Sequence, residues 1–346
     1  MRKSIKVMFA VALSATMVAS MGMAAFADET EAAAGEKAKV DWRSEDLTVY
    51  KDLGPLKIGY APATMNNPFW LACEDGVKEA LDAAGVEYTI AEVDGSGDQA
   101  KINDGINNLI ADKIDVLIAA PADVAAAESA FKACVDAGIP IVNFDTPVDE
   151  AGYGDLCETI IASDNYNAGY VCGADVAAKF PDGLKLIVAH SPRATSCTLR
   201  YAGFFDALDE AGVAYEKVNE LDGQGDTEAS MKVCADALVA DPDVDVIFAI
   251  NDPSVMGCLQ AVDQATVQLE KDIKLYGVDG NPDVKKLIKD GKVEGTGSQS
   301  PNTLGYDSAV AALKILSGEE VPHDISVDTF LITSENVDDF GTDGWQ

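Results

Sequence analysis

Short apolar runs alternate with longer amphipathic segments along most of the chain. The runs are rich in Val and Ile and show no polar face, whereas the segments between them show the period of a helix. Strands that are apolar on both faces are typical of parallel sheets covered by helices on both sides. The pattern therefore predicts an α/β fold of the doubly wound type. The predicted strands are Leu56–Tyr60, Tyr88–Val93, Val116–Ala120, Pro140–Phe144, Thr159–Ala162, Leu184–Ala189, Val213–Val218, Val246–Ile250, Leu275–Val278 and Val293–Ser298, and the clearest helices are Phe69–Ala84, Asp123–Ala137 and Thr227–Ala240.

Part of this pattern occurs twice. Gly76–Tyr88 (GVKEALDAAGVEY) and Gly203–Tyr215 (GFFDALDEAGVAY) are identical at eight of thirteen positions. DGSGD at Asp94–Asp98 is likewise matched by DGQGD at Asp222–Asp226. The spacing is far longer than the roughly 20–50 residues of a solenoid repeat. It predicts one domain-sized unit used twice, with a ligand cleft between two similar lobes.

The first 27 residues differ from the rest. They begin with basic residues, continue with the apolar run Val7–Met23, and end in the A-x-A cleavage pattern Ala25-Phe26-Ala27. This order is typical of a secretory signal peptide, and it predicts an exported protein of the periplasm or Gram-positive cell envelope. An uncleaved membrane anchor is the alternative, but polar residues interrupt the run. Because no Cys lies near the cleavage site, we expect no lipid anchor. Residues 28–54 read as an acidic linker.

Charge and composition narrow the classes of partner. The net charge is −34, and it is −37 without residues 1–27, which hold three basic residues and no acidic residue. Such a protein repels nucleic acid, so we expect no nucleic-acid partner. The chain has only two histidines and no C-x-x-C spacing, so we expect no metal site. Gly95–Ala100 fits a relaxed dinucleotide fingerprint, but it follows the second strand of its unit and its duplicate breaks the pattern, so we expect no cofactor. Most of the seven cysteines are expected to be free thiols, since a protein of this size needs no disulfides; they are Cys73, Cys134, Cys157, Cys172, Cys197, Cys234 and Cys258.

Polar side chains follow several of the predicted strands. In doubly wound sheets, ligands bind beyond the carboxyl ends of the strands. Carboxylates, amides and a guanidinium at these ends can pair with the hydroxyls of a sugar or polyol, and aromatic rings can pack on the C–H face of a pyranose. No nucleophile with a His partner occurs, so we expect a binding protein and not an enzyme. The predicted ligand-binding residues are Asn67, Phe69, Trp70, Asp145, Arg200, Asn251, Asp279 and Gln299.

Other residues near strand ends have simpler interpretations. Asp98 and Asp226 each precede a predicted helix, and we expect them to be helix caps. Neighbouring residues on a helix do not share a face, so we expect one of Phe69 and Trp70 to pack in the core.

The same residues carry a resemblance to a known family. The sequences are NNPFW at 66–70, IASDN at 161–165, Thr195-Ser196 followed by Arg200, IFAIND at 247–252, YGVDGNPD at 276–283, and Gln299. Across residues 55–335 the chain resembles the periplasmic sugar-binding proteins of the ribose-binding type, which deliver solutes to ABC importers. The resemblance implies the type I periplasmic-binding-protein fold, and it assigns ligand contacts to the same eight residues.

The resemblance also implies how the chain is divided. The N-terminal lobe would comprise residues 55–163 and 300–328, and the C-terminal lobe residues 164–299 and 329–346. A three-strand hinge would join the lobes and let them close over a sugar or polyol. An ABC permease would read the closed form, and a monomer is expected.

Three positions depart from the ribose binder. Thr146 stands where the family has an Arg, Ala63 where it has a Ser, and Gly225 where it has a Phe. These departures predict a roomier pocket, suited to a hexose, a polyol or another hydroxylated solute. A sensor that presents its closed form to a receptor or histidine kinase stays open as the alternative to transport.

Overall fold

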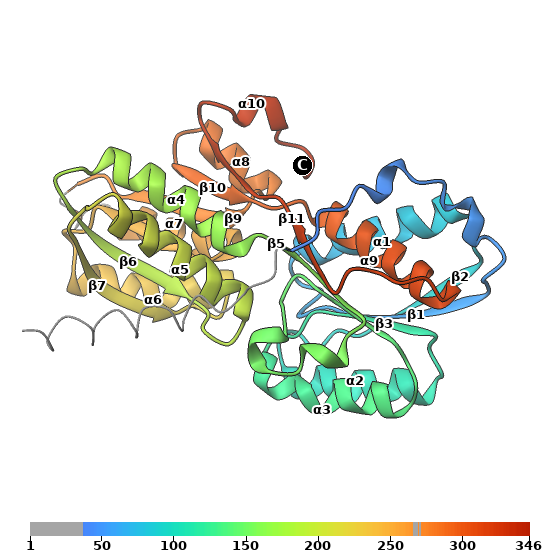
Figure 1. Cartoon of the computed structure of the whole chain (residues 1–346). Helices are drawn as coiled ribbons and strands as arrows, with labels where there is room; N and C mark the ends of the chain where they lie inside the picture. Colours follow the sequence, from blue (N-terminus) through green and yellow to red (C-terminus); the bar gives the residue numbers. More distant parts are fainter. Residues whose placement is uncertain (1–36, 266–268, 270) are drawn as a thin grey trace, which may run out of the picture. The chain divides into compact units, whose positions relative to one another are not determined.

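Two six-stranded sheets form the framework of this computed structural model, which describes residues 37–265, 269 and 271–346 (Figure 1). The first sheet has the order β11-β5-β4-β3-β1-β2, and each of its neighbouring pairs is parallel. Its four-residue inner strands β3 and β4 are buried along their whole length, as the apolar runs predict. The strands are β1 (Leu56–Ala61), β2 (Tyr88–Glu92), β3 (Val116–Ala119), β4 (Ile141–Phe144), β5 (Thr159–Ser163) and β11 (Asp324–Val327).

The second sheet repeats the strand order of the first. Its order is β12-β10-β9-β8-β6-β7, and its pairs are parallel except β10 with β12. The duplicated sequence therefore builds the same framework twice, and the α/β prediction of two similar doubly wound lobes is confirmed. The strands are β6 (Leu184–His190), β7 (Tyr215–Asp222), β8 (Val246–Ala249), β9 (Lys274–Asp279), β10 (Gly295–Ser298) and β12 (Phe330–Thr333).

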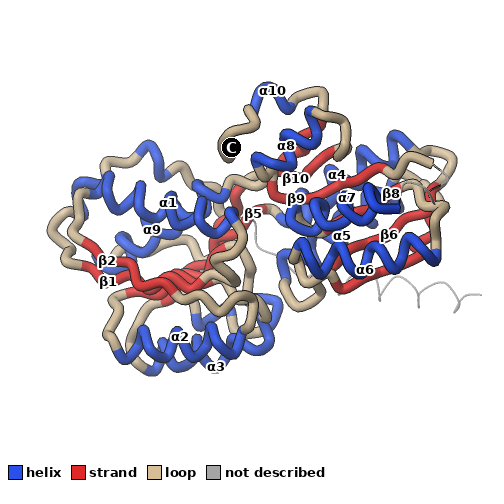
Figure 2. Tube along the Cα trace, turned by 180° about the vertical axis from the view of Figure 1, so that it is seen from behind, coloured by secondary structure: helices blue, strands red, loops and turns tan. Residues whose placement is uncertain are grey.

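Helices cover both faces of each sheet (Figures 1 and 2). On the first sheet, α1 and α9 bury their apolar residues against one face, and α2 and α3 against the other. On the second sheet, α4 and α5 cover one face, and α6, α7 and α8 the other. Each lobe thus has two apolar layers around a central sheet. The helices are α1 (Pro68–Ala84), α2 (Gln99–Ala111), α3 (Val124–Asp136), α4 (Asn165–Lys179), α5 (Thr195–Glu210), α6 (Thr227–Ala240), α7 (Asp252–Ala265), α8 (Pro282–Lys289), α9 (Pro301–Ser317) and α10 (Val337–Phe340).

Two glycines of the duplicated segment let neighbouring helices approach closely. A Cβ added at Gly76 of α1 would lie 2.1 Å from the carbonyl oxygen of Asn302 in α9. A Cβ added at Gly203 of α5 would lie 2.0 Å from the carbonyl oxygen of Tyr166 in α4. Both distances are far below van der Waals contact. The two copies therefore retain glycine at the same place for the same steric reason.

The repeated DGxGD segments form the same turn. The Asp94 carboxylate accepts a hydrogen bond from the N–H of Ser96 at 2.8 Å, and the Asp222 carboxylate accepts one from Gln224 at 3.0 Å. Asp98 and Asp226 then cap α2 and α6, which confirms their prediction as helix caps.

The chain passes between the two sheets at three places within the described ranges. It leaves the first sheet after β5, returns to it after β10, and leaves it again between β11 and β12. Hydrogen bonds link two of these passages: the Thr329 hydroxyl donates to the carbonyl of Asp164, and the Asn167 amide donates to the carbonyl of Thr329, both at 2.9 Å.

The described part of the predicted linker, residues 28–54, contributes to the core of the first lobe. The short 3-10 helices η1 (Trp42–Ser44) and η2 (Leu47–Tyr50) place Trp42, Leu47 and Tyr50 in the core beside α1 and α9. The predicted signal peptide, residues 1–27, and the first part of the linker lie outside the described residues. All seven cysteines are free and buried, as the sequence predicts for most of them. No helix within residues 37–265, 269 and 271–346 is long and apolar enough to cross a membrane.

Candidate functional site

A cavity of about 430 Å³ opens where loops from both lobes meet. The first lobe contributes the loop after β1, the start of α1 and the residues after β4. The second lobe contributes the start of α5, the last residue of β9, and residues after β8 and β10. All of the residues selected from the sequence line this one cavity. They are Asn67, Phe69, Trp70, Asp145, Arg200, Asn251, Asp279 and Gln299.

Asp145 and Asp279 hold equivalent positions in the two lobes. Asp145 directly follows β4, and Asp279 is the last residue of β9, the corresponding strand of the second sheet. Both have a positive φ, 58° at Asp145 and 141° at Asp279, and residues other than glycine rarely adopt such angles. Unusual backbone angles of this kind concentrate at functional sites, because only the surrounding structure maintains them.

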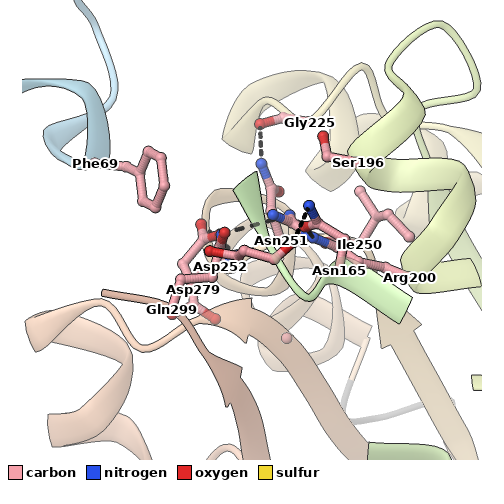
Figure 3. Close-up of polar contacts among 12 residues, drawn as sticks. Phe69, Asn165, Ser196, Arg200, Gly225, Ile250, Asn251, Asp252, Asp279 and Gln299 are labelled. Atoms are coloured by element: carbon pink, nitrogen blue, oxygen red, sulfur yellow. Dashed lines mark hydrogen bonds and ion pairs between the residues drawn. The ribbon is translucent and has the colours of Figure 1, made fainter. Parts of the chain in front are cut away.

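Arg200 lies at the centre of the polar wall (Figure 3). Its guanidinium is buried; Nε donates to Oδ1 of Asn165 at 2.8 Å, and one terminal nitrogen donates to the carbonyl of Ile250 at 3.2 Å. The same nitrogen lies 3.5 Å from Oδ1 of Asp279. Because these contacts fix the plane of the guanidinium, its donors are held in one orientation.

Asp279 has several partners around its buried carboxylate. Nε2 of Gln299 donates to its Oδ1 at 2.7 Å, and the backbone N–H of Asp252 donates to Oδ2 at 3.4 Å. Burial raises the pKa of Asp279, while the charge of Arg200 acts to lower that pKa. This carboxylate is therefore part of the framework that holds Arg200 as well as part of the cavity wall.

Asp145 has fewer partners. Its Oδ2 accepts a hydrogen bond from the Thr146 hydroxyl at 3.0 Å, but its buried Oδ1 accepts none, and neither does the buried Oε1 of Gln299. Burial raises the pKa of Asp145, and the charge of Arg200 and the Thr146 hydroxyl lower it. Buried polar atoms almost always have a partner, so unpaired acceptors on two residues of the cavity lining make Asp145 and Gln299 candidates for ligand contact.

The aromatic wall comes from the start of α1. The rings of Phe69 and Trp70 lie 5.2 Å apart and edge-to-face, and Trp70 packs in the same way on Phe144 at 5.7 Å. The Tyr60 hydroxyl donates to the carbonyl of Trp70 at 2.7 Å. The sequence predicts that one of Phe69 and Trp70 packs in the core, and in the structure both do. Both residues also line the cavity, because α1 begins at the cavity edge.

Asn67 and Asn251 have local roles as well. Oδ1 of Asn67 caps α1 by accepting from the N–H of Phe69 at 3.0 Å. Oδ1 of Asn251 accepts from the N–H of Ser254, and its Nδ2 donates to the carbonyl of Gly225, both at 3.0 Å. The side-chain oxygens of both residues are thus used within the fold, and so is one N–H of the Asn251 amide.

Some residues of the site do not follow from the strand-end rule. Asn165 orients Arg200 but begins a helix, and its only signal in the sequence is its place in the IASDN segment. Arg193 lines the cavity and is exposed, although no pattern in the sequence singles it out. Among the described residues, no group of three or more acidic, His or Cys side chains is arranged to hold a metal ion.

Two similar α/β lobes, three chain passages between them, and a polar cavity with an aromatic wall define a binding protein for small polar solutes. The chain belongs to the family described as "Periplasmic binding protein domain", which matches residues 58–320.

Similar proteins of known function agree with this assignment. The chain is 30% identical over 279 residues to the ribose import binding protein of Bacillus subtilis (strain 168), which covers 80% of this chain and 87% of that protein. It is 32% identical over 282 residues to the ribose import binding protein of Escherichia coli (strain K12). This match covers 80% of this chain and 90% of that protein. These relatives are binding proteins of importers rather than enzymes.

The fold has close counterparts among solved structures. A solute binding protein of an ABC transporter from Agrobacterium vitis, with bound D-fucose, superposes with a TM-score of 0.74 at 26% identity. The superposition covers 82% of this chain and 97% of that protein. The resemblance to ribose-type periplasmic sugar-binding proteins is therefore confirmed, together with the type I periplasmic-binding-protein fold.

Proposed function

We propose that this protein captures a sugar or related polyhydroxylated small molecule in the cavity between its lobes and delivers it to an ABC importer. The observation that carries the proposal is the lining of the cavity. The residues that line it include Asp145 and Gln299, each with an unpaired buried acceptor, and Arg200, whose guanidinium is held in place by hydrogen bonds. The Phe69 ring lies across from Arg200, Asn251 and Asp279 (Figure 3).

This lining suits neighbouring hydroxyl groups. A sugar hydroxyl both donates and accepts, so it can donate to Oδ1 of Asp145 and accept from Arg200 or from the amide of Asn67. A hydrogen bond to a charged group contributes about 1.5–3 kcal/mol, roughly twice a neutral one. A flat aromatic face supplies the apolar counterpart for the C–H groups of a sugar ring. Together these groups bind a compact, hydroxyl-rich molecule better than an apolar or strongly charged one.

The three departures from the ribose binder fall in this cavity. Thr146, Ala63 and Gly225 all line it. Each is smaller than the family residue, and Thr146 also replaces a charge. We infer that the cavity accepts a solute larger than a pentose or with a different hydroxyl pattern, such as a hexose or a cyclic polyol.

The remaining parts of the proposal concern location and partners. The sequence of residues 1–27 supports export by a signal peptide, and periplasmic binding proteins as a family are exported. We infer a monomer that acts without catalysis and presents its closed form to an ABC permease. The relatives are named for import, and this supports transport over presentation to a receptor or histidine kinase.

A thermal-shift screen of the purified protein against pentoses, hexoses and polyols tests the proposal. A solute at about 100 times its dissociation constant adds about 2.7 kcal/mol to the unfolding free energy. We expect a clear shift with at least one hexose or polyol, and recovery of that solute unchanged after long incubation. A flat response across the whole panel would contradict the proposed solute class, and a chemically altered solute would contradict a binding role.

A further inference from the structure

Residues 341–346 run from the end of α10 in the second lobe toward the first lobe (Figure 1). They line none of the cavity. Their contacts nevertheless reach three of the residues assigned to the site, namely Phe69, Asp279 and Gln299.

Lys285 of α8 anchors this segment to the second lobe. Its Nζ donates to the carbonyl of Gly344 at 2.8 Å, to Oε1 of Gln346 at 3.1 Å and to the carbonyl of Phe340 at 3.4 Å. The Lys285 side chain has no exposed surface. Two acceptors from the segment and one from the end of α10 surround the buried ammonium group and hold the segment in a fixed place, because leaving the ammonium unpaired would be strongly unfavourable.

Gln346 ties the segment to the ends of two strands. Its Nε2 donates to the carbonyl of Asp279 at 3.1 Å and also to the carbonyl of Gln299. Gly280 makes room for it: a Cβ at that position would lie 2.4 Å from Nε2 of Gln346. The backbone that carries two polar side chains of the site therefore rests against the Gln346 amide.

Trp345 reaches the first lobe. Its ring lies edge-to-face on the Phe69 ring, with centroids 5.9 Å apart and planes 81° apart. It packs against the apolar cluster formed by the first sheet, α1 and α9. The segment thus links the two lobes at a place other than the three chain passages.

We propose that residues 341–346 form a strap that positions the aromatic wall and the Asp279–Gln299 wall of the site. In this role Trp345 is a positioning residue: it fixes the ring of Phe69 and does not touch the solute. The inference rests on the proposed function for its effect on binding. Its structural part, that the strap orders the start of α1, stands independently of any solute.

Hydrogen exchange in the solute-free protein tests the structural part. We expect the amides of Phe69 and Trp70 to exchange faster in Trp345→Ala than in the natural protein, and Trp345→Phe to restore most of the protection. Asp339→Ala, an exposed change in α10, serves as the matched control. Unchanged exchange at these two amides in Trp345→Ala would overturn the strap, whether or not a solute is known.

A double-mutant cycle tests the effect on binding. With the solute that gives the largest thermal shift, Trp345→Ala should weaken affinity by up to about tenfold, the upper range for an aromatic pair. Trp345→Phe should weaken it much less. In a Phe69→Leu background the effect of Trp345→Ala should largely vanish, because the two residues act as one unit.

The outcomes of the cycle separate the two proposals. Equal affinity in Trp345→Ala and the natural protein, or an equal loss in both backgrounds, would overturn the positioning role while leaving the proposed function intact. If no sugar or polyol binds the natural protein, the proposed function fails, and the exchange result alone decides for or against the strap.

Discussion

Asp145 and Asp279 occupy equivalent places in the two lobes, but their surroundings differ. Asp279 has Gln299, Arg200 and a backbone N–H around it, whereas Oδ1 of Asp145 is buried without a partner. One copy of the duplicated framework thus uses its strand-end carboxylate to organise the site. In the other copy, one oxygen of the carboxylate has no partner, so Asp145 is the residue at which the proposed role in binding can best be tested separately from the fold.

Asp145→Asn should weaken solute binding without weakening the fold. The amide oxygen can still accept from Thr146, so no hydrogen bond of the structure is lost. The missing charge removes a charge-assisted bond of about 1.5–3 kcal/mol to a solute hydroxyl, which corresponds to at least tenfold in affinity. Isothermal titration calorimetry with the best solute of the screen measures the loss.

The unfolding free energy supplies the control for this change. Burial raises the pKa of Asp145, so its ionised form destabilises the solute-free protein, and Asp145→Asn should be at least as stable as the natural protein near pH 8. Asp155→Asn, at an exposed position nearby, should leave affinity unchanged. Natural affinity in Asp145→Asn would remove this residue from the site.

A second buried carboxylate, Asp307 of α9, should make the unfolding free energy depend on pH. Burial raises the pKa of Asp307 to about 7, with Arg43 lowering it and Asp41 raising it by smaller amounts. Between about pH 4 and pH 7 the folded protein therefore holds a proton that the unfolded chain has lost. By linkage, this group makes the unfolding free energy fall as pH rises through that window.

Asp307→Asn should remove this component of the pH dependence. The variant should be more stable than the natural protein by up to about 4 kcal/mol at pH 8, and similar to it at pH 4. Urea unfolding at several pH values measures the difference. Asp104→Asn, at an exposed position of α2, should show no such trend, and a constant difference between Asp307→Asn and the natural protein across pH would contradict the assignment.

Among the elements, the paired helices α1 with α9 and α4 with α5 approach each other closely at several glycines, which include Gly76 and Gly203. Gly76→Ala and Gly203→Ala would each place a methyl group about 2 Å from a backbone oxygen, which no side-chain rotation can relieve. The expected loss is about 1–3 kcal/mol, although alanine favours a helix by up to about 1 kcal/mol over glycine.

Chemical denaturation of these two variants measures the loss. Asp75→Ala, exposed and adjacent to Gly76 in α1, should be neutral or slightly stabilising. If both glycine variants matched the natural protein in stability, the helices would have to pack less closely than the structure shows.

At the same scale, the framework was largely predictable from the sequence. Ten strands lie where the apolar runs place them, and Thr227–Ala240 begins and ends as predicted. The strands β11 and β12 escaped prediction because each has only four residues and lies at a sheet edge, where a long apolar run is not required. Residues 38–54 looked like a linker because their three core side chains lie among acidic residues.

The site was predictable where it lies on strand ends. Asp145, Asp279 and Gln299 followed from the rule that ligands bind beyond the carboxyl ends of parallel strands. Asn165 and Trp345 did not, because they act on other side chains of the site from segments that are remote in sequence. Such contacts depend on the folded arrangement, and the rule for strand ends gives no signal for them.

At the scale of the whole molecule, the site is divided between two lobes. Asp145 and Phe69 belong to the half built on the first sheet, and Arg200 and Asp279 to the half built on the second. The charge of Arg200 nonetheless lowers the pKa of Asp145. Since neither lobe carries the full set of partners, a solute that contacts both halves has a higher affinity for arrangements in which the lobes are close together.

Solute binding should therefore make the molecule more compact. A solute shifts the arrangement of the lobes only as far as its affinities for the two arrangements differ, and a solute with partners in both lobes has that difference. Small-angle X-ray scattering should show a smaller radius of gyration at saturation, with a midpoint that follows the calorimetric dissociation constant. Asp145→Asn should reach the same radius of gyration at a solute concentration about tenfold higher, as expected for a change in binding free energy of about 1.4 kcal/mol. Asp155→Asn should follow the natural protein. An unchanged radius of gyration in the presence of calorimetrically saturating solute would show that this protein binds without closing its lobes.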